Sequence, residues 1–446
     1  MKKFICYILV AVACIAQSFT FPPDDKPREF VVEGIKVIFK PSVKEIVSAR
    51  FFIKGGTANY TKEQEGIEAL ALSVVTEGGT KSLNKTAFAT ALEKIGTNIG
   101  SSTALDYSEI NLSCIKDFWD PSWKLFADAI VNPAFDAKEF ELIKGKAVSA
   151  AKESESNPDV HLKNKSLENT FAGRNYSKIT TGTAASLEKL TVDQVAAHYK
   201  SILGKKNAFI VVVGNISEED LKQKVAAAFK GLGAGKTLQP EKKIEFKPQA
   251  TIENRDIATN YIRGLMSAPS MNDKEGTAMM LSTAILYDRF FVELRTKRSL
   301  SYAPAVNYAS SAITNPYALF YISTTDPKQS LQVMMDEINK VKNQGFSEKE
   351  LKDMKESYLT TFFMGLETND SQTFTLGTRE VAGDWKKAES FMSDVEKITV
   401  QDLNAVFKKY SSSINWTYLG KESAVSKDDF KQPQLFPDNT KISPKK

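Results

Sequence analysis

A long internal repeat constrains the fold of this chain more than any other feature of its sequence. Residues 189–194 (KLTVDQ) return as residues 397–402 (KITVQD), at an offset of 208 residues. In both places an amphipathic helix pattern follows, and then an apolar strand pattern, at 208–214 and at 414–420. Solenoid repeats recur every ~20–50 residues, so a period this long indicates a duplicated domain instead.

A second pair of similar patterns supports the repeat. A long helix pattern at 136–155 ends at Asn157-Pro158, and a similar pattern around 350–355 ends at 368–370 (TND). The stretch between the two copies contains glycine, proline and lysine and has no periodicity, which is typical of a linker. We therefore predict an N-terminal domain over residues 28–235, a linker over 236–252, a C-terminal domain over 253–425 and a polar tail over 426–446.

The first residues have the features of a secretory signal peptide. Met1-Lys2-Lys3 is positively charged, and the apolar run at 4–16 is too short to span a bilayer. We predict a signal peptide over residues 1–20, export to a bacterial periplasm, and no transmembrane span after its removal. Residues 11–14 (AVAC) also resemble a lipobox, so acylation of Cys14 is an alternative.

Charge and cysteine content exclude two classes of site. The net charge of +5 is spread along the chain, and no basic block is interleaved with aromatic residues, so nucleic acid is not expected as a partner. Cys6 and Cys14 lie in the predicted signal peptide, which leaves Cys114 without a partner for a disulfide. Cys114 falls in an alternating strand pattern, and we interpret it as a packing residue.

A short buried helix dominates the first domain. Apolar side chains occupy nearly every position from 67 to 75, and Gly78-Gly79 supplies a stop after the last turn. A strand that ends in Gly55-Gly56 precedes this helix, and a second helix pattern at 85–95 follows it.

This order of strand, paired glycines, helix, Gly-Thr and second helix resembles the pitrilysin/insulinase-like zinc metallopeptidases. The resemblance implies an α+β fold of two homologous α/β sandwich domains. Each domain would hold a mixed, mostly antiparallel sheet of about six strands, with helices on one face. In active members the helix carries H-x-x-E-H, whose histidines bind Zn²⁺ and whose glutamate activates the metal-bound water.

The motif residues are absent from this chain. Laid on the sequence from Gly66, the motif places the first histidine at Ala69, the glutamate at Leu72 and the second histidine at Ser73. The third zinc ligand of the family, a glutamate on a later helix, falls at or near Ala150. These side chains cannot bind zinc, so the resemblance implies no metal or cofactor in this chain.

The remaining histidines do not replace the missing ligands. The chain has only His161 and His198, both in helix patterns far from the helix at 67–75, and we expect neither of them near it. We interpret both as surface or packing residues. The sequence also lacks the G-x-S-x-G pattern of a serine hydrolase, so a self-sufficient hydrolase is disfavoured.

A second motif retains its polar residues. Residues 294–303 (LRTKRSLSYA) resemble a segment of the family's C-terminal domain in which an arginine and a tyrosine hold the substrate backbone and stabilise the oxyanion in trans. The resemblance gives these roles to Arg295 and Tyr302, and a guanidinium and a phenol are suitable donors. The alternative is a solvated basic helix end followed by a half-buried strand tyrosine. The glycine-rich segment that often precedes this motif is missing at 285–291.

Two functional hypotheses follow from the resemblance. In the first, the chain is a catalytically incomplete subunit that pairs with a zinc-bearing H-x-x-E-H homologue around a peptide-degrading chamber. The partner would hold the Zn²⁺, this chain would supply Arg295 and Tyr302, and peptides would be the substrates. No metallopeptidase activity is expected from the chain alone. In the second, the chain is a non-catalytic scaffold or a peptide-binding protein of the same fold.

Overall fold

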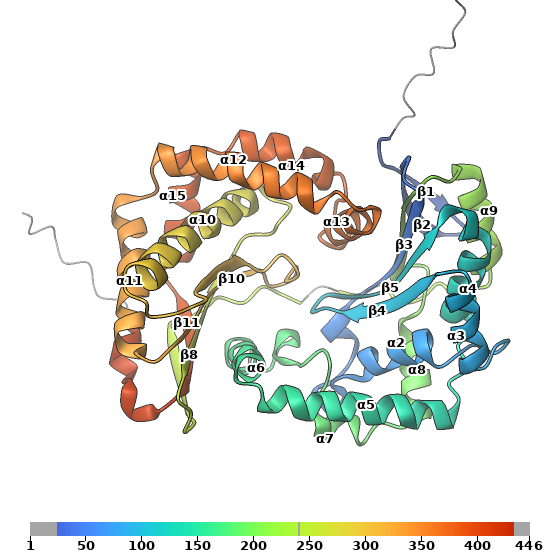
Figure 1. Cartoon of the computed structure of the whole chain (residues 1–446), viewed down its shortest axis with the longest axis horizontal. Helices are drawn as coiled ribbons and strands as arrows, with labels where there is room; N and C mark the ends of the chain where they lie inside the picture. The colour runs from blue at the N-terminus through green and yellow to red at the C-terminus, as the bar shows by residue number, and fades with distance from the viewer. Residues whose placement is uncertain (1–24, 240, 432–446) are drawn as a thin grey trace, which may run out of the picture.

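The computed structural model describes residues 25–239 and 241–431 of the 446-residue chain. These residues form two α/β halves, each built on one β-sheet, that lie side by side (Figure 1). The first half is blue to green in Figure 1, and the second half is yellow to red. The predicted signal peptide over 1–20 lies outside the described residues, as does the tail from residue 432 onward.

The first half contains a six-stranded sheet in the order β1-β2-β6-β3-β5-β4. Every neighbouring pair is antiparallel except β2–β6, which is parallel. The strands are β1 (Arg28–Val32), β2 (Ile35–Pro41), β3 (Ile46–Lys54), β4 (Asn98–Thr103), β5 (Tyr107–Ile115) and β6 (Ala208–Gly214). The α-helices are α2 (Ile67–Glu77), α3 (Lys85–Lys94), α4 (Trp119–Val131), α5 (Ala137–Ser156), α6 (Pro158–Thr170), α7 (Ala184–Leu187), α8 (Val192–Ile202) and α9 (Glu218–Phe229).

The second half contains a five-stranded sheet in the order β7-β11-β8-β10-β9, in which only β7–β11 is parallel. The strands are β7 (Gln249–Asn254), β8 (Asn260–Ser267), β9 (Ala305–Tyr308), β10 (Tyr317–Thr324) and β11 (Ile414–Gly420). The α-helices are α10 (Lys274–Phe290), α11 (Pro327–Gln344), α12 (Glu348–Gly365), α13 (Asn369–Val381), α14 (Lys387–Glu396) and α15 (Val400–Tyr410). The predicted α+β fold of two homologous halves with mixed, mostly antiparallel sheets is confirmed.

The sequence repeat corresponds to the same capped helix in each half. Thr191 caps α8 and forms a capping box with Gln194, and Thr399 caps α15 and forms one with Asp402. Each capping box satisfies backbone N–H groups that the first helical turn leaves without an intrahelical partner. The helix then leads into β6 or β11, which forms the parallel pair of its sheet.

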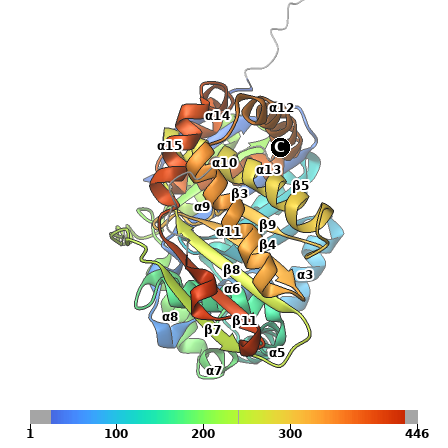
Figure 2. The ribbon, with the colours of Figure 1, turned by 90° about the vertical axis from the view of Figure 1, so that its left-hand side faces the viewer.

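The two halves each contribute one helix to the other. Helix α6 of the first half packs on β8 and β11 of the second sheet, and α13 of the second half packs on β3 and β6 of the first sheet. Figure 1 shows α6 and α13 between the two sheets. Other helices contact each sheet from within its own half: α2, α4 and α9 contact strands of the first sheet, and α10 and α11 contact strands of the second. Figure 2, in which the second half faces the viewer, shows α10 and α11. The sequence predicted helices on one face of each sheet, but it did not predict the exchange of α6 and α13.

The exchange explains why β6 reads as an uninterrupted apolar run. Ile210 and Val212 belong to the core between the first sheet and its own helices. Phe209, Val211 and Val213 point to the other face of the sheet and pack with Leu376 of helix α13 from the second half. A strand that is buried on both faces loses the polar-apolar alternation of a half-exposed strand.

A polar cluster reinforces the contact between the halves. The guanidinium of Arg50 on β3 forms ion pairs with Glu109 on β5 and with Asp370 on α13, where Nη2 of Arg50 lies 2.8 Å from each carboxylate oxygen. Its Nε also donates to Thr373 on α13 at 3.0 Å. Hydrogen bonds between charged groups are stronger than those between neutral groups, so the contacts of Arg50 with Asp370 and Thr373 help to hold α13 on the first sheet.

Two boundaries differ from the predicted ones. Strand β7 begins at Gln249, inside the predicted linker over 236–252, because it pairs with the distant strand β11 and has no apolar run of its own. The predicted tail over 426–446 begins with a short 3₁₀ helix, Lys427–Phe430, and Phe430 is buried against Trp416. In the described part of the chain, no helix has the length and apolar character needed to cross a bilayer.

Candidate functional site

Helix α2 contains Ala69, Leu72 and Ser73, the three residues at which the H-x-x-E-H motif of the family would stand. It begins after Gly66, which has φ +84° and lies so close to Gly182 and Thr181 that a side chain there would clash with their backbone. Ala69 and Ser73 are half-buried, whereas Leu72 is completely buried in the core. The packing of its apolar side chains in the core therefore holds the helix in place.

All four degenerate positions lie on the helices α2 and α5. The two helices pack together, and Lys146 Nζ on α5 lies 3.9 Å from Glu77 Oε2 on α2. Glu77 is one turn after Ser73, and Lys146 is one turn before Ala150, so each pair shares one face of its helix. Ala150 itself is exposed. Ser73 and Ala150 thus lie on the helix faces that carry Glu77 and Lys146, whose exposed side chains meet at the edge of this helix pair.

Neither these positions nor their surroundings can hold a metal ion. Within residues 25–239 and 241–431, no three His, Cys, Asp or Glu side chains are grouped closely enough to hold one. A structural zinc site needs four ligands, and a catalytic zinc site needs three protein ligands with an open position. The residues present therefore do not fit the zinc centre of the family.

One expectation about the histidines was wrong. His198 on α8 contacts α2, because its Nε2 lies 3.3 Å from the buried carboxylate of Glu68. Asn59 donates to the same oxygen of Glu68 at 2.9 Å. The contact joins residues 130 positions apart, so no local pattern could have shown it. His161 lies on α6 at the contact between the halves, with its Nε2 2.7 Å from Glu253 on β7.

The cysteine behaves as predicted for a packing residue. Cys114 on β5 is a free thiol and is 2% exposed. Burial raises its pKa above the usual value for a thiol. A nucleophilic cysteine needs the opposite shift, because the thiolate is the reactive form.

Arg295 lies in an unusual helical turn at the end of α10. Residues Phe291–Thr296 form a π-helix, in which Lys297 N–H donates to the carbonyl of Val292 at 2.9 Å. Short π-helical segments are rare and occur frequently at functional sites. The chain then reverses at Ser299, a non-glycine residue with φ +51°. This strained turn returns the backbone toward the helix end.

The reversal places Tyr302 over Arg295. The guanidinium carbon of Arg295 lies 4.3 Å from the centroid of the Tyr302 ring and 4.8 Å from that of Phe291. Tyr302 is 80% exposed, so the stack lies at the surface. The sequence predicted a half-buried strand position for Tyr302 as the alternative, but the residue precedes β9 in an exposed loop.

The neighbouring cations are neutralised, whereas Arg295 is not. Lys297 Nζ lies 2.6 Å from a carboxylate oxygen of Glu293, and Arg298 pairs with the other oxygen. The side chains of Arg295 and Tyr302 have only the ring contacts given above and no hydrogen-bonding partner among the described residues. The donors of this pair are therefore available to a ligand.

Two family models match the chain and together cover more than half of it. The insulinase model (peptidase family M16) matches residues 36–184, and a model described as the peptidase M16 inactive domain matches residues 189–358. The boundary between the two matches falls before α8, the first copy of the repeated helix.

Individual relatives are similar over nearly the whole chain. A Helicobacter pylori protein named non-peptidase homolog YmxG is 20% identical over 430 residues, which are 94% of this chain and 98% of that protein. The structure of a peptidase M16 inactive domain from Pseudomonas fluorescens has a TM-score of 0.82 at 20% identity, covering 89% of this chain and 98% of that chain. The periplasmic protease PqqL of Escherichia coli gives 0.75 at 14% identity, covering 90% of this chain but only 47% of PqqL.

Proposed function

We propose that this chain, which belongs to the insulinase family of peptidases (M16), is the catalytically incomplete subunit of an exported two-subunit zinc peptidase. Its partner is a homologue that carries H-x-x-E-H and binds the Zn²⁺. The two subunits enclose a chamber in which peptides are cleaved, and this chain contributes Arg295 and Tyr302 to substrate binding.

One observation carries the proposal. The helices α2 and α5 pack together, but the motif positions on them hold Ala69, Leu72, Ser73 and Ala150. Tyr302 is exposed and Arg295 is half-buried, and the side-chain donors of both have no hydrogen-bonding partner among the described residues. Loss of the metal site with retention of this donor pair is expected of a subunit that acts on a centre in its partner. A protein that had lost all contact with substrate would not need an unpaired arginine at a strained turn.

The chemistry of the pair suits peptide cleavage. Attack of water on a peptide carbonyl places negative charge on the carbonyl oxygen, and a preorganised guanidinium and phenol can donate to that oxygen. The partner's metal would supply the activated water. Stacking of Arg295 on Tyr302 orients both donors before substrate arrives, which reduces the cost of organising them during the reaction.

Chain length supports a two-unit assembly. This chain aligns with 47% of PqqL, so that protease has room for two units of this size in one polypeptide. This chain together with a homologous partner would form an assembly of about that size. The signal-like residues 1–20, which lie outside the described structure, support placing the assembly outside the cytoplasm.

The test is whether the chain forms a complex with a zinc-bearing M16 homologue from the same organism. Sedimentation velocity of the equimolar mixture should show a heterodimer, and the mixture should cleave a peptide library faster than the homologue alone. A heterodimer without added cleavage would instead favour the scaffold hypothesis. The absence of any complex would reject the subunit assignment.

A further inference from the structure

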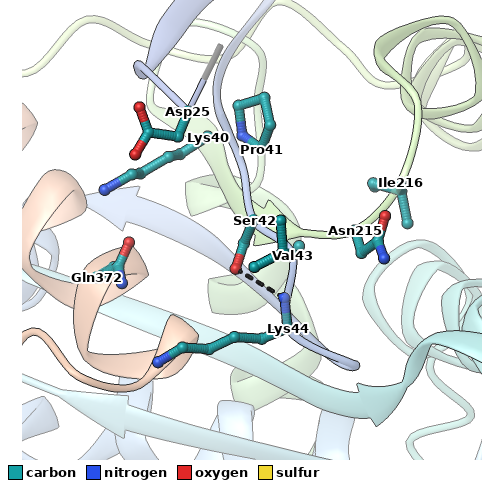
Figure 3. A pocket seen from close by; sticks show the side chains of 10 residues that line it. Asp25, Lys40, Pro41, Ser42, Val43, Lys44, Asn215, Ile216 and Gln372 are labelled. Atoms are coloured by element: carbon teal, nitrogen blue, oxygen red, sulfur yellow. Dashed lines mark hydrogen bonds between the residues drawn. The ribbon is translucent and has the colours of Figure 1, made fainter. Parts of the chain in front are cut away.

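A cavity of about 720 Å³ lies where the two halves meet, away from the Arg295–Tyr302 pair (Figure 3). Its walls come from the end of β2 with the loop that follows it, from the end of β6, and from Gln372 in the first turn of α13. This volume lies within the range of small-ligand sites, which is about 300–1,000 Å³.

The cavity carries positive charge. Figure 3 shows the side chains of Lys40 and Lys44 extending toward α13, with Gln372 between their ends. The side chain of Lys40 has no ion pair or hydrogen bond with the described residues. Lys44 Nζ donates to the carbonyl of Glu367, and an ammonium group has two more donors to offer. Asp25 also lines the cavity, but it is not ion-paired with either lysine in the described structure.

Gln372 adds an acceptor whose orientation is fixed. Its Nε2 donates to the carbonyl of Leu366 at 2.8 Å, which determines which end of the amide is the oxygen. The Oε1 atom is buried and has no hydrogen-bonding partner within the described structure. In Figure 3 this oxygen points to the side of the cavity on which Lys40 lies. A buried acceptor without a partner is costly, so it favours a ligand that brings a donor.

The remaining wall is apolar. Val43 is 74% exposed, and Pro41 and Ile216 line the same cavity. Beside the carboxylate of Asp25, the site therefore combines two cations, one amide acceptor and an apolar surface. A peptide C-terminus has the complementary set: a carboxylate, the N–H of its last residue and a side chain.

We propose that this cavity binds the C-terminal end of short peptides. The terminal carboxylate pairs with Lys40 and Lys44, the N–H of the last residue donates to Gln372 Oε1, and an apolar last side chain packs on Val43 and Ile216. Gln372 belongs to the second half, and the lysines belong to the first. A bound peptide therefore adds contacts across the two halves. The choice of peptides as ligands rests on the proposed function.

Binding can be measured on the full single chain, without any partner. The probes are N-acetyl-Ala-Ala-Ala-Leu with a free carboxylate, the same peptide as its carboxamide, and inorganic phosphate alone. Isothermal titration calorimetry should show binding of the acid and at least tenfold weaker binding of the amide. Lys40→Met should weaken binding of the acid at least tenfold. Lys81→Met, an exposed lysine outside the cavity, should leave it unchanged.

Three outcomes would overturn the assignment: equal affinity for acid and amide, wild-type affinity in Lys40→Met, or Lys40-dependent binding of phosphate without binding of the acid. The assay needs no catalysis, so it separates this site from the proposed function. If peptides bind in the cavity but the chain does not activate a zinc-bearing homologue, only the subunit assignment is rejected. If the chain activates the homologue but peptides do not bind in the cavity, only this site is rejected.

Discussion

Gly377 of α13 lies directly against the ring of Phe52 on β3, so close that a Cβ atom at position 377 would overlap the ring. Phe52 is completely buried and stacks on Phe209, with ring centroids 4.9 Å apart and the rings parallel within 1°. The ring therefore cannot move away. The exchanged helix can approach the first sheet only because position 377 lacks a side chain.

This contact predicts the sign of a glycine substitution. Gly377→Ala should lower the free energy of unfolding by about 1–3 kcal/mol, because overpacking of a rigid core outweighs the helix propensity that alanine gains. Gly145→Ala is the matched control. Gly145 also lies inside a helix, α5, and a Cβ atom there would have no neighbour within 4 Å. The control should gain about 0.5–1 kcal/mol. Urea unfolding measures the free energy of unfolding of both variants. An equal increase in Gly377→Ala and Gly145→Ala would contradict the close packing of Gly377 on Phe52.

A hydrogen bond between the halves predicts a dependence on pH. The indole N–H of Trp385 donates to the carboxylate of Glu29 at 2.6 Å, and this bond lowers the pKa of Glu29 below its ordinary value of 4.5. The unfolded chain then takes up the proton first as the pH falls, so the stabilisation is present above about pH 4.5 and is lost as the pH falls through the lower, folded-state pKa.

Glu29→Gln removes this titration while keeping an acceptor for Trp385. Wild type should be more stable than Glu29→Gln at pH 7, and the difference should disappear on acidification. Glu45→Gln, which removes an exposed charge from the neighbouring loop, should show no such convergence. Chemical unfolding at several pH values checks both variants. A constant difference between wild type and Glu29→Gln would exclude a role for ionised Glu29.

Placing ligand residues at the degenerate positions tests whether these positions correspond to the zinc ligands of the family. Ala69→His and Ser73→His would place two imidazoles one turn apart on α2, and Ala150→Glu would add a carboxylate from the facing helix. The triple variant should bind one zinc per chain after dialysis, and the two-histidine variant should bind at least ~10-fold more weakly. Because Leu72 remains, neither variant should cleave peptides. A folded triple variant without zinc would show that these positions do not converge.

The Arg295–Tyr302 pair predicts a specific catalytic loss in the complex. Arg295→Ala and Tyr302→Phe should each lower peptidase turnover, by up to about 10²-fold if each removes a donor to the oxyanion. The losses should not add, because Arg295 also holds the Tyr302 ring at 4.3 Å. Arg298→Ala is the control, since Arg298 pairs with Glu293. Equal effects of all three substitutions would indicate a general loss of charge.

The sequence was informative where a pattern is local. The capped helices after Thr191 and Thr399 and the buried strand at 208–214 could be predicted, because capping boxes and apolar runs are properties of neighbouring residues. The absence of zinc ligands could also be predicted, since it needs only the residue identities at the motif. The fold class followed from the repeat and from the family resemblance.

The contacts between the halves could not be predicted. Helices α6 and α13 give no sign in their patterns that they cover the sheet of the other half, and Arg50 meets Asp370 across 320 positions. The contact of His198 with Glu68 and the π-helical turn around Arg295 were missed for similar reasons. A histidine in a helix pattern does not reveal which distant carboxylate it meets, and a π-turn differs from an α-turn only in its hydrogen bonds.

The most direct test of the central claim is peptidase turnover of the equimolar mixture of this chain and its zinc-bearing homologue, with zinc counted in every sample. We expect no zinc and no cleavage for this chain alone, one zinc per heterodimer, and turnover of the mixture well above that of the homologue alone. Turnover of the mixture equal to that of the homologue, or zinc-dependent cleavage by this chain alone, would contradict the claim.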